Sequence, residues 1–280
     1  MRLAKNTVAA VTGAGSGIGR ALALALAREG CALALADKDA HSLANTAAEA
    51  RKAGAGTVST HAVDVADLAA MTRFRDEVKQ AHRYVHLLVN NAGVALGGEF
   101  EQVSIDDMRW LIDINFWGVV HGTKLFLPLL RENRQAHIVN ISSIFGIIAP
   151  AGQTAYAASK FAVRGFSEAL RHELGDTRIR VTTVHPGGVR TNIANSSIPD
   201  DLVLTAAERA RAEKRIRIFN EKVLTMPPDV AARVILDGVA HGRTRIVVTA
   251  QAVWLDRLIR LLPVGYVRRI AAFDSATFGD

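Results

Sequence analysis

Residues 12–19 read Thr12-Gly13-Ala14-Gly15-Ser16-Gly17-Ile18-Gly19 and lie between a short apolar run, 7–12, and a helical run, 18–28. Between a strand and a helix, glycines let the backbone turn tightly and come close to a phosphate group, which the helix N-terminus attracts. The spacing is T-G-x-x-x-G-x-G, which differs from the usual G-x-G-x-x-G dinucleotide fingerprint. We interpret the stretch as a pyrophosphate-binding turn, with a purely structural turn as the alternative. Its candidate contacts are Gly13, Gly15, Ser16, Gly17, Ile18 and Gly19.

The rest of the chain continues the alternation of strand and helix. Further β-type runs are expected at 31–37, 58–63, 86–90, 137–142, 179–185 and 245–249, and helical runs at 39–53, 67–81, 105–130, 154–174 and 228–238. Such alternation is typical of a parallel sheet that is covered by helices on both faces. With right-handed crossovers, it predicts a doubly wound, seven-stranded α/β domain of Rossmann-like architecture.

The composition is that of a packed globular protein. Of the 280 residues, 49% are hydrophobic and 22% are charged, which argues against a disordered or fibrous chain. The single cysteine, Cys31, excludes an internal disulfide framework and a cysteine-based zinc site, and we expect no metal site. The N-terminus lacks the apolar region of a signal peptide and no run approaches the length of a membrane span, so we expect a cytoplasmic protein.

The net charge of +7 raises nucleic acid and acidic membranes as partners. The excess is concentrated near the C-terminus, where residues 241–269 hold six arginines and one acidic residue. Because no nucleic-acid-binding motif accompanies this cluster, we expect no nucleic-acid partner. The same segment carries a helical apolar stripe, which suits packing on a neighbouring subunit or on an anionic membrane, with packing on protein favoured. The stripe consists of Trp254, Leu255, Leu258, Leu261 and Leu262.

Asp37 ends the second predicted strand, 20 residues after Gly17. A carboxylate at this position can accept hydrogen bonds from the adenosine ribose hydroxyls and would repel a 2′-phosphate. Because the glycine turn carries Ser16 and no basic side chain, the sequence favours NAD over NADP, although the adjacent Lys38 can weaken this discrimination. A solvated charge at the end of a strand is the alternative interpretation.

Tyr156 and Lys160 are one helical turn apart and therefore lie on the same face of their predicted helix. A phenol, with a pKa near 10, is a poor base at neutral pH, and a nearby ammonium group stabilises the phenolate. The pair therefore predicts a tyrosine with a lowered pKa that transfers protons.

With these motifs in this order, the chain resembles the short-chain dehydrogenase/reductase family over about residues 5 to 250. The resemblance rests on the glycine turn, Asp64-Val65, Asn90-Asn91-Ala92-Gly93, Asn115, Ser143, Tyr156 with Lys160, and the segment Pro186-Gly187-Gly188-Val189-Arg190-Thr191. Ser142 is adjacent to Ser143, and only the family's spacing to the tyrosine favours Ser143. Taken singly, each residue also has a local structural explanation, such as a cap or a turn.

The resemblance implies a mechanism and a set of site residues. Ser143 would bind the substrate oxygen, Tyr156 would transfer the proton, Lys160 would bind the nicotinamide ribose and stabilise the phenolate, and Asn115 would hold a water that links Lys160 to solvent. Asp64 and Val65 are expected near the adenine, Asn91 beside the ribose, and Val189 and Thr191 near the carboxamide. Ala92, Gly93, Pro186 and Gly187 are expected to line the same cofactor site.

The loops around these residues predict the substrate class. The apolar segments 144–150 and 94–96 suit a hydrophobic secondary alcohol or ketone, such as a steroid, a retinoid or another lipid-derived molecule. The alternatives are an NADP-dependent carbonyl reductase and a catalytically weak, dinucleotide-sensing or protein-binding member of the same fold.

The chain is expected to form one catalytic domain, 1–250, followed by a basic amphipathic extension, 251–280. Within the domain, the irregular segment 192–226 predicts a substrate lid. The family resemblance also implies a homodimer or homotetramer, in which the helices near 105–130 and 154–174 face their copies.

Overall fold

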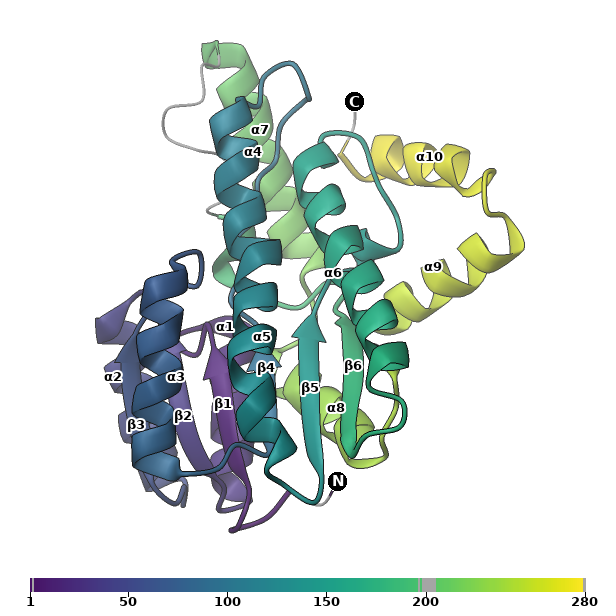
Figure 1. Ribbon diagram of the computed structural model, residues 1–280. Coiled ribbons are helices and arrows are strands. Elements are labelled where there is room, and N and C mark those ends of the chain that lie inside the picture. Colours follow the sequence, from purple (N-terminus) through teal and green to yellow (C-terminus); the bar gives the residue numbers. More distant parts are fainter. Residues whose placement is uncertain (2, 196, 198–204, 279–280) are drawn as a thin grey trace.

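A seven-stranded parallel sheet forms the centre of the molecule (Figure 1). The computed structural model describes residues 1, 3–195, 197 and 205–278. The strand order is β3-β2-β1-β4-β5-β6-β7, and every neighbouring pair is parallel. The strands are β1 (Val8–Thr12), β2 (Ala32–Asp37), β3 (Val58–Ala62), β4 (Leu87–Asn90), β5 (Ala136–Ile141), β6 (Ile179–His185) and β7 (Arg245–Val247). The sequence prediction of a doubly wound sheet is confirmed.

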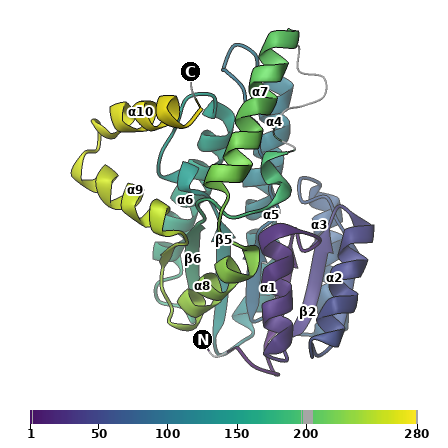
Figure 2. The ribbon, with the colours of Figure 1, turned by 180° about the vertical axis from the view of Figure 1, so that it is seen from behind.

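Helices cover both faces of the sheet because its central strands are apolar on both sides. One face packs against α1 (Gly17–Arg28), α2 (Ala40–Lys52) and α8 (Pro228–Ala240). Figure 2 shows α1 and α8 in front of the sheet. The other face packs against α3 (Leu68–His82), α5 (Gly118–Arg131) and α6 (Thr154–Glu173). Aspartate side chains cap the start of two of these helices, Asp39 at α2 and Asp67 at α3.

The helix expected at 105–130 is not continuous. It consists of α4 (Ile105–Ile112), a π-helical turn η1 (Asp113–Trp117), and α5. The additional residue of a π turn shifts the register of the side chains relative to a regular helix, and such turns are frequent at functional sites. Asn115 lies in this turn and is fully buried.

The C-terminal part of the chain forms two further helices beside the sheet. β7 ends at Val247, two residues earlier than expected, because Thr249 caps the next helix by accepting a hydrogen bond from the N–H of Ala252. This helix is α9 (Ala250–Leu261), and it is followed by α10 (Tyr266–Phe278). Figure 1 shows both extending away from the sheet, joined by a turn at the outer edge of the molecule.

The segment predicted as a lid lies above the carboxyl ends of the strands. It contains η3 (Asn192–Ala194), α7 (Ala206–Ile218) and a π turn η4 (Phe219–Val223), and residues 196 and 198–204 of the predicted segment are outside the described residues. α7 begins with a reciprocal capping box between Thr205 and Glu208 and contacts α10. Within the described ranges, no helix is long and apolar enough to cross a membrane.

Candidate active site

The polar residues that the sequence singled out gather at the carboxyl ends of the strands, where open α/β sheets bind ligands. They surround a cavity of about 970 Å³. The predicted residues that line it are Gly13, Ser16, Gly17, Ile18, Asp37, Asp64, Val65, Asn91, Ala92, Gly93, Ser143, Tyr156, Lys160, Pro186, Gly187, Val189 and Thr191. Gly15, Gly19 and Asn115 are not among the residues lining the cavity, and all three are buried.

The glycine turn leaves space where side chains would stand. Gly13 and Gly17 have φ angles of +64° and +53°, which favour glycine. A Cβ on Gly13 would lie 2.8 Å from the Cα of Ala92. Within the described residues, the Ser16 side chain forms no capping hydrogen bond, so it leaves the first N–H groups of α1 available to a ligand. This arrangement fits a pyrophosphate.

The Asp37 carboxylate stands beside the turn and is held by two backbone N–H groups. Gly15 donates to one oxygen at 2.7 Å and Asp39 to the other at 3.0 Å. Lys38, which the sequence placed beside this carboxylate, instead forms an ion pair with Asp64 at 2.9 Å. Lys38 is therefore not paired with the Asp37 carboxylate, whose negative charge favours a free ribose hydroxyl over a phosphate there.

Asn91 ties β4 to the glycine turn. Its side-chain amide donates to the carbonyl oxygens of Thr12 and Gly13, at 3.0 and 3.1 Å. Its own N–H donates to the Thr12 hydroxyl at 3.0 Å. Although Asn91 lines the cavity, its amide hydrogens are therefore engaged in shaping the turn.

A second cluster lies across the cavity, where α6 passes the end of β5. Tyr156 and Lys160 are buried, and the Lys160 nitrogen lies 5.6 Å from the centre of the tyrosine ring. The Ser143 side chain is hydrogen-bonded to Tyr156. The neighbouring Ser142 hydroxyl donates to the Lys160 carbonyl oxygen at 2.8 Å. Thus Ser143 is directed to the phenol, and Ser142 fixes the helix to the loop.

The acid–base properties of this cluster differ from the expectation of a lowered tyrosine pKa. Burial raises the pKa of Tyr156 to about 12, and the hydrogen bond with Ser143 opposes this only partly. Burial also lowers the pKa of Lys160 to about 8. The spacing in the sequence places the phenol and the ammonium group near each other, but the loss of water around both groups depends on the tertiary structure.

Asn115 lies beside this cluster, where its side chain is hydrogen-bonded to the backbone of Val94 and to the side chain of Ser159. Its side chain accepts from the N–H of Val94 at 2.8 Å and donates to the Val94 carbonyl at 2.9 Å and to Ser159 at 3.1 Å. A Cβ on Gly93 would come within 3.0 Å of the Asn115 oxygen and 3.2 Å of the Lys160 nitrogen. The glycine thus allows both polar groups to approach the same point.

Replacing Lys160 by methionine is expected to stabilise the ligand-free protein at pH 7 by about 3 kcal/mol. Because folding lowers the lysine pKa from its ordinary 10.5 to about 8, the folded state disfavours the charged form. Burial of the charged lysine therefore lowers the free energy of unfolding by its full amount well below pH 8. This loss disappears as the pH rises toward 10.5. Urea unfolding at pH 7 and pH 10 measures it, and an equal gain at both values would assign the effect to packing.

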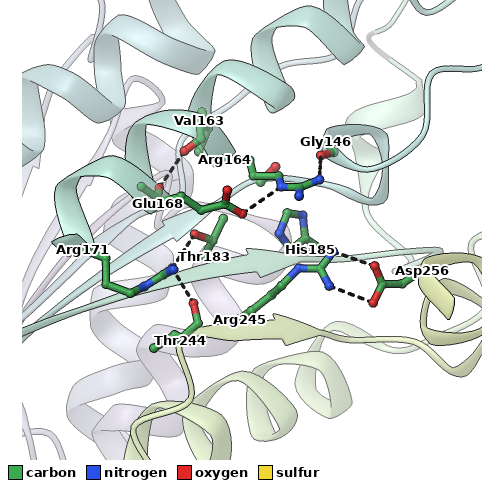
Figure 3. Close-up of polar contacts among 12 residues, drawn as sticks. Gly146, Val163, Arg164, Glu168, Arg171, Thr183, His185, Thr244, Arg245 and Asp256 are labelled. Carbon is green, nitrogen blue, oxygen red and sulfur yellow. Dashed lines mark hydrogen bonds and ion pairs between the residues drawn. The ribbon is translucent and has the colours of Figure 1, made fainter. Parts of the chain in front are cut away.

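The loop after Ser143 is supported from behind by a polar network on α6, β6, β7 and α9 (Figure 3). His185 is buried, which lowers its pKa to about 4, so the neutral ring can donate from Nδ1 to the Ser143 carbonyl oxygen at 3.0 Å. Arg164 donates to Glu168 and to the carbonyl oxygen of Gly146. These contacts fix the backbone that carries Ser143.

The C-terminal tail forms a wall of the cavity, which the sequence did not predict. Of its apolar stripe, expected on another subunit or a membrane, Leu255 packs against Ile144, Ile147 and Ile148 of the same chain. Leu258 lines the cavity, whereas Leu261 and Leu262 are exposed. Figure 3 shows Arg245 of β7 holding Asp256 of α9 through two hydrogen bonds of 2.7 and 2.8 Å. The lining residues that sequence reasoning did not assign to the cavity include Trp254, Leu255, Leu258, Arg269 and Ile270 from the tail, and Phe219, Val223 and Leu224 from the segment predicted as a lid. The helical spacing of the stripe was the available signal.

Metal-binding side chains do not cluster at this site. Among the described residues, no group of three or more His, Cys, Asp or Glu side chains is placed to hold a metal ion. His137 and His185 are buried and hydrogen-bonded to neighbours in the core. The Cys31 thiol is also buried, which raises its pKa to about 11 and makes it a packing group.

Comparison with known sequences gives a consistent result. The sequence profile described as short chain dehydrogenase matches residues 7–202. SadH of Mycobacterium tuberculosis, named as an oxidoreductase, is 43% identical over 267 residues, covering 95% of this chain and 94% of SadH. This match is long enough to continue into the tail beyond residue 250.

Two solved structures share the architecture. A short chain dehydrogenase/reductase from Burkholderia phymatum, crystallised with NAD, is 33% identical, with a TM-score of 0.83, covering 91% of this chain and 92% of that one. A short chain dehydrogenase from Mycobacterium paratuberculosis, bound to NAD, is 26% identical, with a TM-score of 0.75, covering 89% of this chain and 97% of that one.

Proposed function

This chain belongs to the short-chain dehydrogenase family, and we propose that it transfers a hydride between NAD and a hydrophobic secondary alcohol or ketone. One observation carries the proposal. The hydroxyl of Ser143, the phenol of Tyr156 and the ammonium of Lys160 line the same cavity as the glycine turn. A chain that only sensed dinucleotides would have no chemical use for the first two groups.

Ser143, Tyr156 and Lys160 have different roles in proton transfer. When bound, the nicotinamide ring accepts or supplies the hydride. In reduction, Ser143 donates a hydrogen bond to the carbonyl oxygen, and Tyr156 gives that oxygen its proton as the hydride reaches the carbon. In oxidation, the Tyr156 phenolate removes the hydroxyl proton as the hydride leaves. The high pKa of Tyr156 keeps the phenol protonated at neutral pH, so Lys160 must supply the positive charge that stabilises its phenolate.

Asp37 supports the choice of NAD. Replacing it by asparagine keeps the shape and removes the charge, so the ratio of kcat/KM with NAD to kcat/KM with NADP should fall about tenfold or more, since repulsion of the 2′-phosphate is relieved. Steady-state kinetics with both cofactors measure the ratio. The exposed Asp106→Asn on α4 is the charge-matched control, and an unchanged ratio in Asp37→Asn would remove this assignment.

The apolar lining supports a hydrophobic substrate. The loop side chains Ile144, Phe145 and Ile148 line the cavity together with Leu255 and Leu258 of the tail, and Phe145 lies against Tyr156. The experiment is a panel of alcohols and ketones, from small polyols to long-chain and polycyclic compounds, followed by the absorbance of reduced cofactor with NAD and with NADP. Turnover that rises with apolar size is expected, and equal turnover of small polyols would contradict the substrate class. Reduction with NADPH alone would favour the carbonyl reductase alternative.

We also propose a homodimer or homotetramer, supported by aromatic side chains exposed on the helices expected to face their copies. Trp110 and Trp117 lie on α4 and η1, and Phe161 lies on α6, which contacts both elements. Replacing Trp117 by glutamate is expected to shift the protein toward monomers because it places a charge in a desolvated contact. Sedimentation velocity measures this, and an unchanged assembly would place the interface elsewhere.

A further inference from the structure

The outer surface of the C-terminal tail is apolar to an unusual extent. We define the tail face as the exposed apolar side chains Trp254, Leu261, Leu262, Val264 and Val267, which are 61%, 80%, 40%, 83% and 55% exposed. They come from α9, α10 and the turn between them. Figure 1 shows this turn projecting beyond the rest of the fold on its side of the molecule. Contiguous apolar surface of this kind marks an interaction site.

Positive charges surround the tail face. Residues 251–270 contain four arginines and one acidic residue, Asp256, which is already paired with Arg245 and Arg260. α10 also contacts α7, another basic helix, on which Arg211, Lys214 and Arg217 are exposed. Apolar side chains with flanking arginines match the acyl boundary and the acidic headgroups of a membrane. The arginines of the tail are Arg257, Arg260, Arg268 and Arg269.

A second copy of the chain suits this face less well. A two-fold contact would bring two copies of the same basic face together, and like charges across an interface oppose association. The aromatic residues proposed for self-association also lie on other helices, α4, η1 and α6. The charge pattern therefore favours an anionic lipid surface.

The helix α9, which carries part of the tail face, is packed firmly on the rest of the fold. The double hydrogen bond between Arg245 and Asp256 joins α9 to β7 (Figure 3), and Ala252 is buried against the loop after Ser143. Because α9 is already packed, the exposed side chains are presented without a folding step. Trp254 lines the cavity while most of its surface is exposed, so it stands where the cavity opens.

We propose that the tail face docks on an anionic membrane surface and opens the cavity toward lipophilic substrates held in the bilayer. Trp254, Leu255 and Leu258 would then form a continuous apolar path from the acyl region to the reacting groups. A lipophilic alcohol could follow it without crossing water. This route of entry rests on the proposed function, whereas the membrane contact itself does not.

Co-sedimentation with lipid vesicles tests the docking. The full chain is expected to sediment with vesicles of phosphatidylglycerol and phosphatidylcholine, much less with phosphatidylcholine alone, and less at high salt. The double variant Leu261→Asp with Val264→Asp should lower the partition coefficient at least about tenfold. The double variant Arg257→Gln with Arg268→Gln should lower it roughly 25-fold on the anionic vesicles only.

Matched controls and two activity measurements complete the test. Leu68→Asp places one aspartate at an exposed apolar position of α3, and Arg73→Gln with Arg131→Gln removes two exposed arginines from α3 and α5. Both controls should leave vesicle binding unchanged. With a water-soluble short-chain alcohol, the tail variants should retain turnover. With a long-chain secondary alcohol embedded in anionic vesicles, they should lose turnover in proportion to binding.

The outcomes distinguish membrane docking from a subunit contact and from failure of the proposed function. Failure of the full chain to bind anionic vesicles overturns the proposal. It is also overturned if the apolar double variant binds vesicles normally but dissociates in sedimentation velocity, because the tail face is then a subunit contact. Normal vesicle binding with no turnover of any alcohol supports docking and contradicts the proposed function alone.

Discussion

Replacing Tyr156 by phenylalanine is expected to lower kcat by about 10²–10⁴-fold in both directions, the range typical of losing a positioned acid–base group. The ring would keep its packing against Phe145, which meets it edge-on with the centroids 5.9 Å apart. The variant loses only the hydroxyl that is hydrogen-bonded to Ser143. The substrate oxygen would then have no side chain to take or give its proton.

The measurement is turnover of an identified substrate, together with thermal unfolding and NAD binding by fluorescence. Both should stay close to those of the unchanged protein, since the glycine turn lies across the cavity. Tyr84→Phe is the matched control, because Tyr84 lies before β4, outside the cavity lining. Undiminished turnover in Tyr156→Phe would falsify the assignment of this phenol as the proton carrier.

Adding a single methyl group at Gly19 is expected to raise the Kd for NAD at least about 100-fold and to destabilise the fold by roughly 1–3 kcal/mol. A Cβ at this position would collide with the carbonyl oxygen of Gly13 and the side-chain amide of Asn91. Neither group can retreat freely, because Asn91 holds Gly13 and Thr12 by hydrogen bonds. The collision therefore deforms the turn that is proposed to receive the pyrophosphate.

Gly165→Ala on α6 provides the matched control. Among the described residues nothing lies within 4 Å of a Cβ built there, so alanine should be neutral or add up to about 1 kcal/mol through its higher helix propensity. Isothermal titration with NAD and urea unfolding compare the two variants. Equal NAD binding in Gly19→Ala and Gly165→Ala would mean that the glycine turn is not the phosphate site.

The order of strands and helices could be predicted because it depends on local patterns. The glycine turn, the strand-end Asp37 and the spacing of Tyr156 and Lys160 all express short-range geometry. Since parallel strands bring their carboxyl ends to one edge, the residues that follow them had to meet there. The structure places Asp37, Asn91 and Ser143 around one cavity, as this argument requires.

The parts that were missed depend on contacts between distant segments. The π turn that buries Asn115 is set by packing against Val94 and Ser159, which no helical periodicity reveals. The expected fall in the pKa of Tyr156 is not found, because burial raises this pKa and the interaction with Ser143 opposes the rise only partly. The sequence shows that the Lys160 ammonium group is close to Tyr156, but it does not show how much water remains around the phenol.

The sequence by itself determined the class of sheet, the glycine turn and the Tyr156–Lys160 pair, since each follows from spacing within one or two neighbouring elements. Only the tertiary structure decided that the C-terminal tail closes the cavity of its own chain. The apolar stripe of α9 would suit any apolar partner equally well. Its partner is fixed by the packing of Ala252 and Leu255 on the loop after Ser143, a contact that spans more than a hundred residues of chain. The Arg245–Asp256 pair, between residues 11 apart, holds α9 against β7.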